Sequence, residues 1–120
     1  MSESALKRTP LHERHRLLGA RMGAFAGWSM PLQYTTPRAE HTAVRERLGV
    51  FDVSHMGQIE VAGARAREAL SRVLTNNIDR LGVGEGQYTL MLTDDGGVIA
   101  GLLVYRLVDR FLLVVNAGNV

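Results

Sequence analysis

Residues 52–55, Asp-Val-Ser-His, bring a carboxylate, a hydroxyl and an imidazole together, which are the groups of a nucleophilic relay. Such a relay needs the histidine within hydrogen-bonding distance of the nucleophile. Neighbouring residues on an extended strand point to opposite faces, so Ser54 and His55 would not face each other there. We therefore do not expect a Ser, His and Asp triad in this segment.

Two other polar groups could bind a metal ion. His12 and His15 are three residues apart on a predicted helix, but no third ligand is near them in the sequence, and we expect both rings to face solvent. Asp94 and Asp95 lack the ligand spacing of a calcium loop and are typical of a turn. The chain has no cysteine, which excludes disulfides, thiolate catalysis and sulfur-ligated metals. No metal site is expected.

Composition and charge narrow the class of protein. The 120 residues are 46% hydrophobic and 22% charged, which is typical of a folded domain. No run approaches the ~18 apolar residues of a membrane span. The first ten residues, MSESALKRTP, lack the apolar core of a signal peptide. We expect a cytoplasmic protein with no membrane partner.

The basic residues do not indicate a nucleic-acid surface. The net charge is only +2. Several arginines lie in predicted helices that also contain glutamate and alanine, and we expect them on solvated helix faces. These residues are Arg45, Arg47, Arg65, Arg67 and Arg72. No nucleic-acid partner is expected, and an anionic small ligand remains open.

Helix signals organise the first part of the chain. Thr-Pro pairs at 9–10 and 36–37 predict two helix starts, with threonine as the N-cap and proline at the first helical position. Gly19 and Gly49 are the predicted ends of these two helices. Between the helices, residues 24–34 show no clear period and are expected to be extended chain and loop.

Strand signals dominate the remainder. An apolar stripe through residues 66–74 predicts one helix. Strands are expected at 50–54, 57–61, 87–93, 98–107 and 111–116, the last three forming an antiparallel meander. Because helices and antiparallel strands interleave without a repeating strand–helix–strand unit, the expected fold class is α+β.

Taken in order, the segments resemble a known family, the T-protein of the glycine cleavage system. The matching stretches are RTPL (8–11), FAGWSMPLQY (25–34), EHTAVRERLGVFDVSHMGQIEVAG (40–63), LTNNIDRL (74–81), QYTLMLTDDGGVI (87–99), LLVYRL (102–107) and FLLVVNAGN (111–119). Members of the family are much longer and have further domains. The resemblance implies that residues 1–120 are the N-terminal part of a folate-binding domain, and that later domains are absent from this chain.

The resemblance also implies a reaction, that of an aminomethyltransferase. The family passes the one-carbon unit of an aminomethyl group, carried on the lipoyl arm of the H-protein, to tetrahydrofolate and releases ammonia. The implied partner is the lipoylated H-protein, and tetrahydrofolate is the acceptor substrate, without a metal. The implied folate contacts are Met56, Tyr88, Tyr105 and Asn116. The residues alone would favour Met56 and Tyr88 as ordinary core side chains.

One strand departs from the family's pattern. Where the family has GGVIDDL, with two aspartates, this chain has Ala100 and Gly101, and Gly101 matches the aspartate that assists attack by the folate nitrogen. Neither a methyl group nor a hydrogen atom can accept a proton or stabilise a developing cation. We expect that no catalytic residue is retained and that residues 1–120 alone are inactive. A non-catalytic folate-binding module and a structural fragment that binds no folate remain open as alternatives.

The three C-terminal strands carry apolar residues on both faces. If these strands pack against absent domains, pairs such as Leu102 with Val104, or Leu112 with Val114, would be partly exposed. Exposed apolar strand faces favour self-association.

Overall fold

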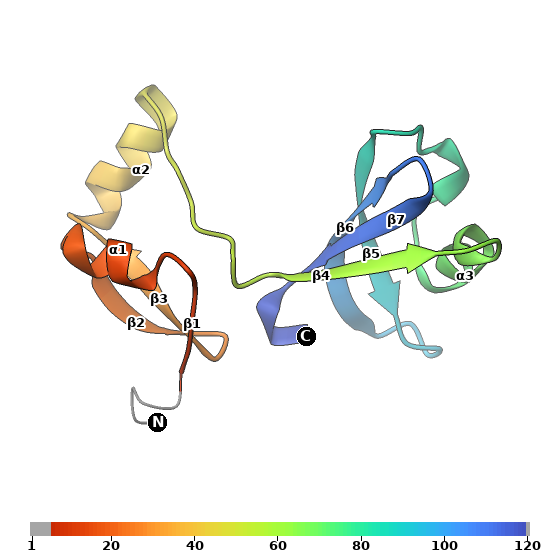
Figure 1. Cartoon of the computed structure of the whole chain (residues 1–120), viewed down its shortest axis with the longest axis horizontal. Helices are drawn as coiled ribbons and strands as arrows, with labels where there is room; N and C mark the ends of the chain where they lie inside the picture. The colour runs from red at the N-terminus through yellow and green to blue at the C-terminus, as the bar shows by residue number, and fades with distance from the viewer. Residues whose placement is uncertain (1–5, 120) are drawn as a thin grey trace. The chain divides into compact units, whose positions relative to one another are not determined.

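The computed structural model describes residues 6–119, which fold as two compact units that divide between His55 and Met56 (Figure 1). The first unit contains β1 (Lys7–Arg8), α1 (His12–Leu17), β2 (Arg21–Phe25), β3 (Trp28–Gln33) and α2 (Pro37–Glu46). The second contains β4 (Gly57–Ala62), α3 (Ala66–Val73), η2 (Ile78–Arg80), β5 (Gly86–Leu92), β6 (Val98–Arg106), β7 (Arg110–Val115) and η3 (Ala117–Asn119). The α+β class expected from the sequence is confirmed.

A β-hairpin replaces the loop that was expected over residues 24–34. Strands β2 and β3 pair antiparallel, and β1 pairs parallel with the other edge of β3. Ala26 (φ 48°) and Gly27 (φ 82°) connect β2 to β3, and two residues of positive φ are what a tight hairpin turn requires. The expectation was wrong because Gly23 and Pro31 interrupt the alternation that marks a strand.

The two Thr-Pro pairs behave differently. The Thr36 side chain accepts a hydrogen bond from the Ala39 amide at 3.2 Å and caps α2, as predicted. The Thr9 hydroxyl instead donates to the Asp52 carboxylate at 2.8 Å, and α1 begins later, after Leu11, without a side-chain cap. A threonine engaged by a distant carboxylate cannot also cap its own helix.

The ends of the helices follow glycine only in part. Helix α1 ends just before Gly19, whose φ of 78° is the left-handed conformation expected there. Helix α2 ends at Glu46, three residues before Gly49. The strand predicted at 50–54 is absent from the described structure, because the Ser54 amide donates to the Asp52 side chain at 2.9 Å and turns the chain.

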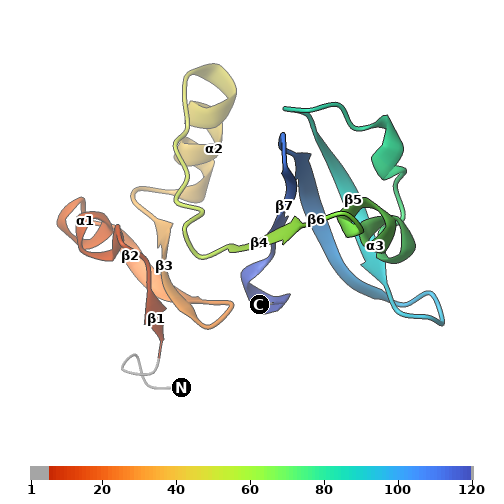
Figure 2. The same ribbon diagram turned by 45° about the vertical axis from the view of Figure 1, so that its right-hand side comes forward.

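The second unit is built on a four-stranded antiparallel sheet of order β4-β7-β6-β5 (Figure 2). Neighbours β5, β6 and β7 form the predicted meander. Strand β4 pairs along the whole of β7, from Gly57 with Val115 to Ala62 with Arg110. This last pairing joins residues about fifty positions apart, which no local sequence pattern could reveal.

Helix α3 and the segment that follows it cover one face of this sheet. The buried core of the second unit consists of Ala66, Leu70, Leu74, Ile78, Leu81, Ala100, Leu102, Val104, Phe111, Leu113 and Val115. Leu102 and Val104 are only 2% and 0% exposed, so the expectation that they would be partly exposed is wrong. Their strand faces α3, whereas Leu112 and Val114 are half-buried on the other face.

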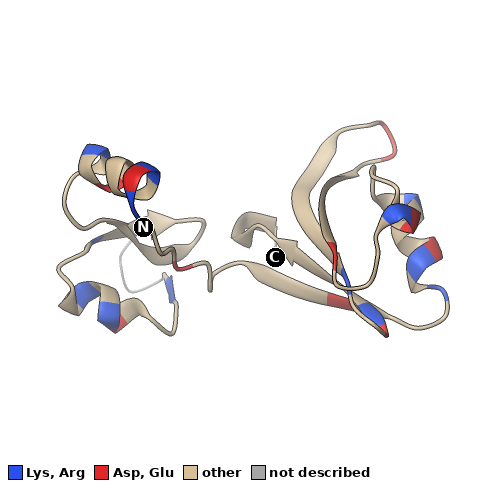
Figure 3. Ribbon diagram, turned by 90° about the horizontal axis from the view of Figure 1, so that it is seen from above, with Lys and Arg blue, Asp and Glu red and all other residues tan. Residues whose placement is uncertain are grey.

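No helix in the described residues is long and apolar enough to cross a membrane. Charged residues of both signs lie on the helices (Figure 3). In α3, Arg72 pairs with Glu68 at 2.5 Å, and Arg67 pairs with Asp79 at 2.7 Å. Partly exposed arginines beside carboxylates match the solvated helix faces that the sequence predicted.

Leu70 and Val73 of α3 differ in burial, so truncating the two side chains should lower the free energy of unfolding by different amounts. Leu70 is 4% exposed and Val73 is 45% exposed. We expect Leu70→Ala to lower the free energy of unfolding by about 2–4 kcal/mol, since it leaves a cavity in the core. Val73→Ala should change it by less than about 1 kcal/mol. Urea unfolding followed by circular dichroism checks both values, and equal costs would contradict the packing of α3 described above.

Candidate functional site

The strand register gathers the predicted folate contacts on one side of the sheet in the second unit. In antiparallel pairs, opposed residues project to the same face, and so does every second residue along a strand. Tyr88 is opposite Leu103, and Tyr105 is opposite Gly86. Gly101 lies two residues from Leu103 and therefore shares their face. We call this side, opposite α3, the outward face.

Met56 and Asn116 complete the set at one end of the sheet. They lie next to the paired residues Gly57 and Val115, Met56 just before β4 and Asn116 just after β7. The Asn116 side-chain amide donates to the Gly101 carbonyl at 3.4 Å. Three of the five positions predicted to matter, Tyr88, Gly101 and Tyr105, thus share one face, and Met56 and Asn116 lie at one end of the same sheet.

Two tyrosine rings lie over two glycines on the outward face. A side-chain carbon built at Gly101 would overlap the Tyr88 hydroxyl oxygen and stand 2.9 Å from Cζ. One built at Gly86 would stand 2.5 and 2.6 Å from Cε1 and Cδ1 of Tyr105. Tyr88 is 61% exposed, so the interpretation of it as a core residue is wrong. Both rings present flat surface on the outward face, and we call the two rings together the aromatic floor.

The Glu60 carboxylate on the outward face is not placed for acid–base catalysis. Alternation puts Glu60, which is opposite Leu112, on this face, and its carboxylate pairs with Arg110 at 3.1 Å. The charges of Asp109 and Glu60 raise the pKa of the Arg110 guanidinium above its ordinary value. Glu60 is therefore held by a permanent cation, and position 101 itself offers only hydrogen.

Ala100 and Gly101 face opposite ways. Ala100 is 6% exposed and belongs to the core beneath α3, where it is opposite Met91. Gly101 faces outward. Of positions 100 and 101, only position 101 could present a carboxylate on the outward face.

A second cluster of polar groups lies in the first unit. Asp52 accepts hydrogen bonds at 2.8 Å from the Thr9 hydroxyl and at 2.8 Å from Nε2 of His15. Nδ1 of the same ring is 2.5 Å from the Tyr34 hydroxyl. His12 and His15 are 6% and 8% exposed, so the expectation that they face solvent is wrong. No local sequence pattern could reveal this cluster, because Asp52 is 37 residues from its histidine.

Hydrogen bonds in this cluster keep Asp52 ionised. Burial acts to raise the pKa of the Asp52 carboxyl, but hydrogen bonds from Ser54, His15 and Thr9 outweigh burial and hold it far below its usual range. Burial, together with the charges of Asp52 and Glu40, raises the pKa of the Tyr34 phenol. An ionised Asp52 only accepts, so Nε2 carries a proton, and in a neutral ring Nδ1 accepts from Tyr34. Every partner is satisfied, which favours a structural role that ties α1, β3 and residues 52–54 together.

His55 takes no part in that cluster. Its ring meets the Phe25 ring edge-on, with centroids 5.7 Å apart, and its Nδ1 is buried without a partner among the described residues. Asp52 is bound to His15 instead. Within the described residues, no three histidine or carboxylate side chains lie close enough to hold a metal ion.

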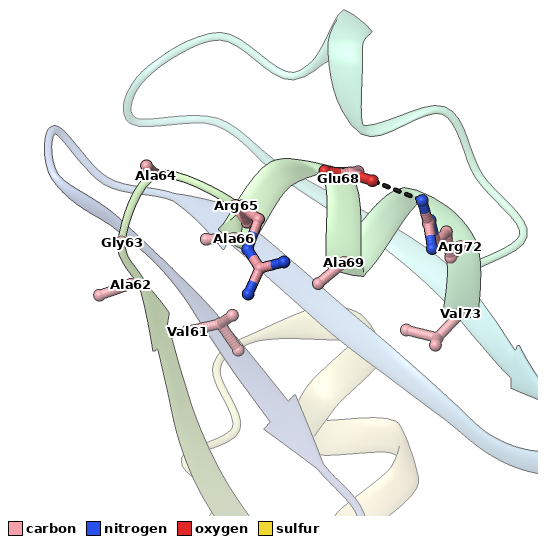
Figure 4. A pocket seen from close by; sticks show the side chains of 10 residues that line it. All are labelled: Val61, Ala62, Gly63, Ala64, Arg65, Ala66, Glu68, Ala69, Arg72 and Val73. Atoms are coloured by element: carbon pink, nitrogen blue, oxygen red, sulfur yellow. Dashed lines mark hydrogen bonds and ion pairs between the residues drawn. The ribbon is translucent and has the colours of Figure 1, made fainter.

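Three hollows in the structure are lined by other residues. One of about 500 Å³ lies in the first unit beside Tyr34 and Asp52. One of about 230 Å³ lies near the β6–β7 turn. The largest of the three, of about 630 Å³, lies between β4 and α3, where Val61, Ala69 and Val73 form an apolar floor beneath the Glu68–Arg72 ion pair (Figure 4). None of these three shares a residue with the five predicted positions.

Comparison with known proteins places these features in a family. The sequence model of the GCVT N-terminal domain matches residues 11–120. The aminomethyltransferase of Halothermothrix orenii is 55% identical over 116 residues, which are 96% of this chain and 32% of that protein. The aminomethyltransferase of Symbiobacterium thermophilum is 54% identical over 120 residues, 99% of this chain and again 32% of that protein.

A solved structure agrees with the sequence comparison. The glycine cleavage system aminomethyltransferase T from Bartonella henselae matches with a TM-score of 0.83 and 42% identity, over 95% of this chain and 32% of that one. The chain thus spans about a third of the length of the relatives that it matches.

The opposite orientations of positions 100 and 101 predict opposite tolerance of a carboxylate. Ala100→Asp places an unpaired charge in the core and should lower the free energy of unfolding by roughly 3 kcal/mol or more. Gly101→Asp places the charge on the outward face and should cost less than about 1 kcal/mol. Chemical denaturation measures the free energy of unfolding of both variants. A stability of Ala100→Asp close to that of the parent chain would show that the strand register is wrong.

The Asp52 cluster predicts a pH dependence for the first unit. A carboxyl with a lowered pKa stabilises the fold above its unfolded pKa of about 3.9, and this contribution is lost as the pH falls below that value. Asp52→Asn should lower the free energy of unfolding by about 2 kcal/mol at pH 7 and should flatten the loss of stability below pH ~4. Fluorescence of Trp28, the only tryptophan, reports this unit.

The matched control is Asp94→Asn, which changes an exposed turn residue and should leave both the stability and its pH profile nearly unchanged. An Asp52→Asn variant with the same acid unfolding as the parent chain would contradict the role given to this cluster.

Proposed function

Because the chain belongs to the GCVT N-terminal domain family, we propose that it supplies the folate-binding face of an aminomethyltransferase of the glycine cleavage system. In this proposal tetrahydrofolate is the one-carbon acceptor, the lipoylated H-protein is the donor, and the protein acts in the cytoplasm. The whole reaction passes the aminomethyl carbon to the folate nitrogen and releases ammonia.

The single observation that supports this proposal most is that Tyr88, Gly101 and Tyr105 share the outward face, with the Asn116 amide bonded to the Gly101 carbonyl beside them. The Tyr105 ring over Gly86 and the exposed Tyr88 ring, which can turn away from Gly101, offer flat apolar surface, and their hydroxyls offer hydrogen bonds. Met56 adds a polarizable thioether and Asn116 an amide that can both donate and accept. A pterin, which is flat and rimmed by polar atoms, needs this combination.

In this chain the face binds and orients, and it contributes no proton acceptor at position 101. Attack by the folate nitrogen develops positive charge, and a carboxylate nearby would stabilise it. Gly101 cannot do so, and Glu60 is paired with Arg110. The residues described here therefore hold the acceptor substrate, while any acid–base catalysis must come from groups elsewhere.

The same glycine favours a second candidate, a folate-binding module that does not turn over. Binding needs the aromatic floor, whereas transfer also needs charge stabilisation at the reacting nitrogen. The two candidates differ only in activity: an aminomethyltransferase gives methylenetetrahydrofolate from the loaded H-protein, and a module does not.

We predict that tetrahydrofolate binds the chain saturably and that Tyr105→Ala weakens binding roughly three- to tenfold, since one aromatic contact is lost. Anaerobic isothermal titration calorimetry measures both affinities. Val73→Ala, on the α3 side of the sheet, is the control and should leave the affinity unchanged. Binding that ignores Tyr105, or an equal loss in the control, would contradict the assignment of the outward face.

A further inference from the structure

Gly101 is not required by its own backbone. The glycines with positive φ are Gly19, Gly27, Gly63, Gly84 and Gly96, all of them outside strand β6. Gly101 lies within β6, paired with Leu90, in a conformation that any residue can adopt. What distinguishes the position is therefore its surroundings.

The space above Gly101 is filled by Tyr88. The Tyr88 hydroxyl oxygen occupies the point where a side chain at position 101 would begin, with Cζ 2.9 Å away. Tyr88 stands on the neighbouring strand β5, opposite Leu103, so its ring reaches diagonally to position 101. The ring is 61% exposed, so it is free to turn toward solvent if something displaces it.

We propose that Gly101 is a positioning residue that sets the orientation of Tyr88. Glycine lets the ring lie against β6 and cover the strand at that point. Any side chain at position 101 takes the place of the Tyr88 hydroxyl and holds the ring away from β6. Replacing the family's aspartate by glycine therefore changes the shape of the outward face as well as its charge.

The consequence for ligand binding rests on the proposed function. A folate that enters the volume above Gly101 must first displace the Tyr88 ring. The measured affinity is therefore lower than the intrinsic affinity, and it rises with the fraction of molecules whose ring is turned away. A methyl group at position 101 displaces the ring without adding charge. Gly101→Ala thus separates the steric effect of the missing aspartate from its electrostatic effect.

The packing is tested by a double-mutant cycle on the full chain with Gly101→Ala, Tyr88→Ala and both together. Alanine in place of glycine normally stabilises a strand, so with Tyr88→Ala we expect Gly101→Ala to raise the midpoint of thermal unfolding by about 2–5 °C. With Tyr88 present the rise should vanish or reverse. Tyr88→Phe, which removes only the overlapping oxygen, should give an intermediate result and is the milder variant.

The matched control is Tyr105→Phe. The ring of Tyr105 covers Gly86 through Cε1 and Cδ1, so the variant removes a tyrosine hydroxyl from the same face without touching position 101. The effect of Gly101→Ala on the unfolding midpoint should be the same with and without Tyr105→Phe. Additive effects of Gly101→Ala and Tyr88→Ala would overturn the proposal.

In a second experiment, tetrahydrofolate is titrated into the same variants. With Tyr88 present, Gly101→Ala should tighten binding about two- to fivefold, and with Tyr88→Ala it should have no effect. Tightening that persists without Tyr88 would overturn the proposal. Coupling in the unfolding midpoints with no tetrahydrofolate binding by any variant would support the positioning of Tyr88 by Gly101 and overturn the proposed function.

Discussion

The alternation of side chains along β6 is the constraint on which the second unit depends. Hydrogen bonding to β5 on one side and to β7 on the other fixes which residues face α3 and which face outward. Leu102 and Val104 are thereby committed to the core, and Gly101 and Tyr105 to the outward face. A slip of one residue would exchange the two sets and expose the core. The strand register therefore determines both which residues form the core and which residues form the outward face.

This constraint places the adjacent residues Ala100 and Gly101 on opposite faces of the sheet. Position 100 faces the core, and its methyl group fits among the apolar side chains beneath α3. Position 101 faces outward and leaves room that the Tyr88 ring fills. The comparisons support the scaffold, while the aspartate expected at position 101 comes from the resemblance alone. The chain therefore retains the features suited to binding a flat ligand and lacks the carboxylate suited to promoting attack.

Sequence patterns predicted the parts of the fold that depend on neighbours in the chain. The β5-β6-β7 meander, α3 and the Thr36 cap follow from local periodicity and turn chemistry. The β4–β7 pairing and the Asp52–His15 contact join residues far apart in sequence, and only the folded chain shows them. The candidate site residues came from the resemblance to a family. The common face of Tyr88, Gly101 and Tyr105 follows from strand register, and the Tyr88 ring over Gly101 from side-chain packing that a linear pattern does not contain.

The proposed function depends on the binding of tetrahydrofolate to the outward face. The chain has three tyrosines, two of which lie on that face, while Tyr34 is held in the first unit by His15. Tyr34 therefore serves as an internal control when tetrahydrofolate is titrated into the chain with ring-labelled tyrosines and followed by nuclear magnetic resonance. We predict saturable shifts of the Tyr88 and Tyr105 signals and a constant Tyr34 signal. A shift confined to Tyr34, or no saturable shift at all, would contradict the claim.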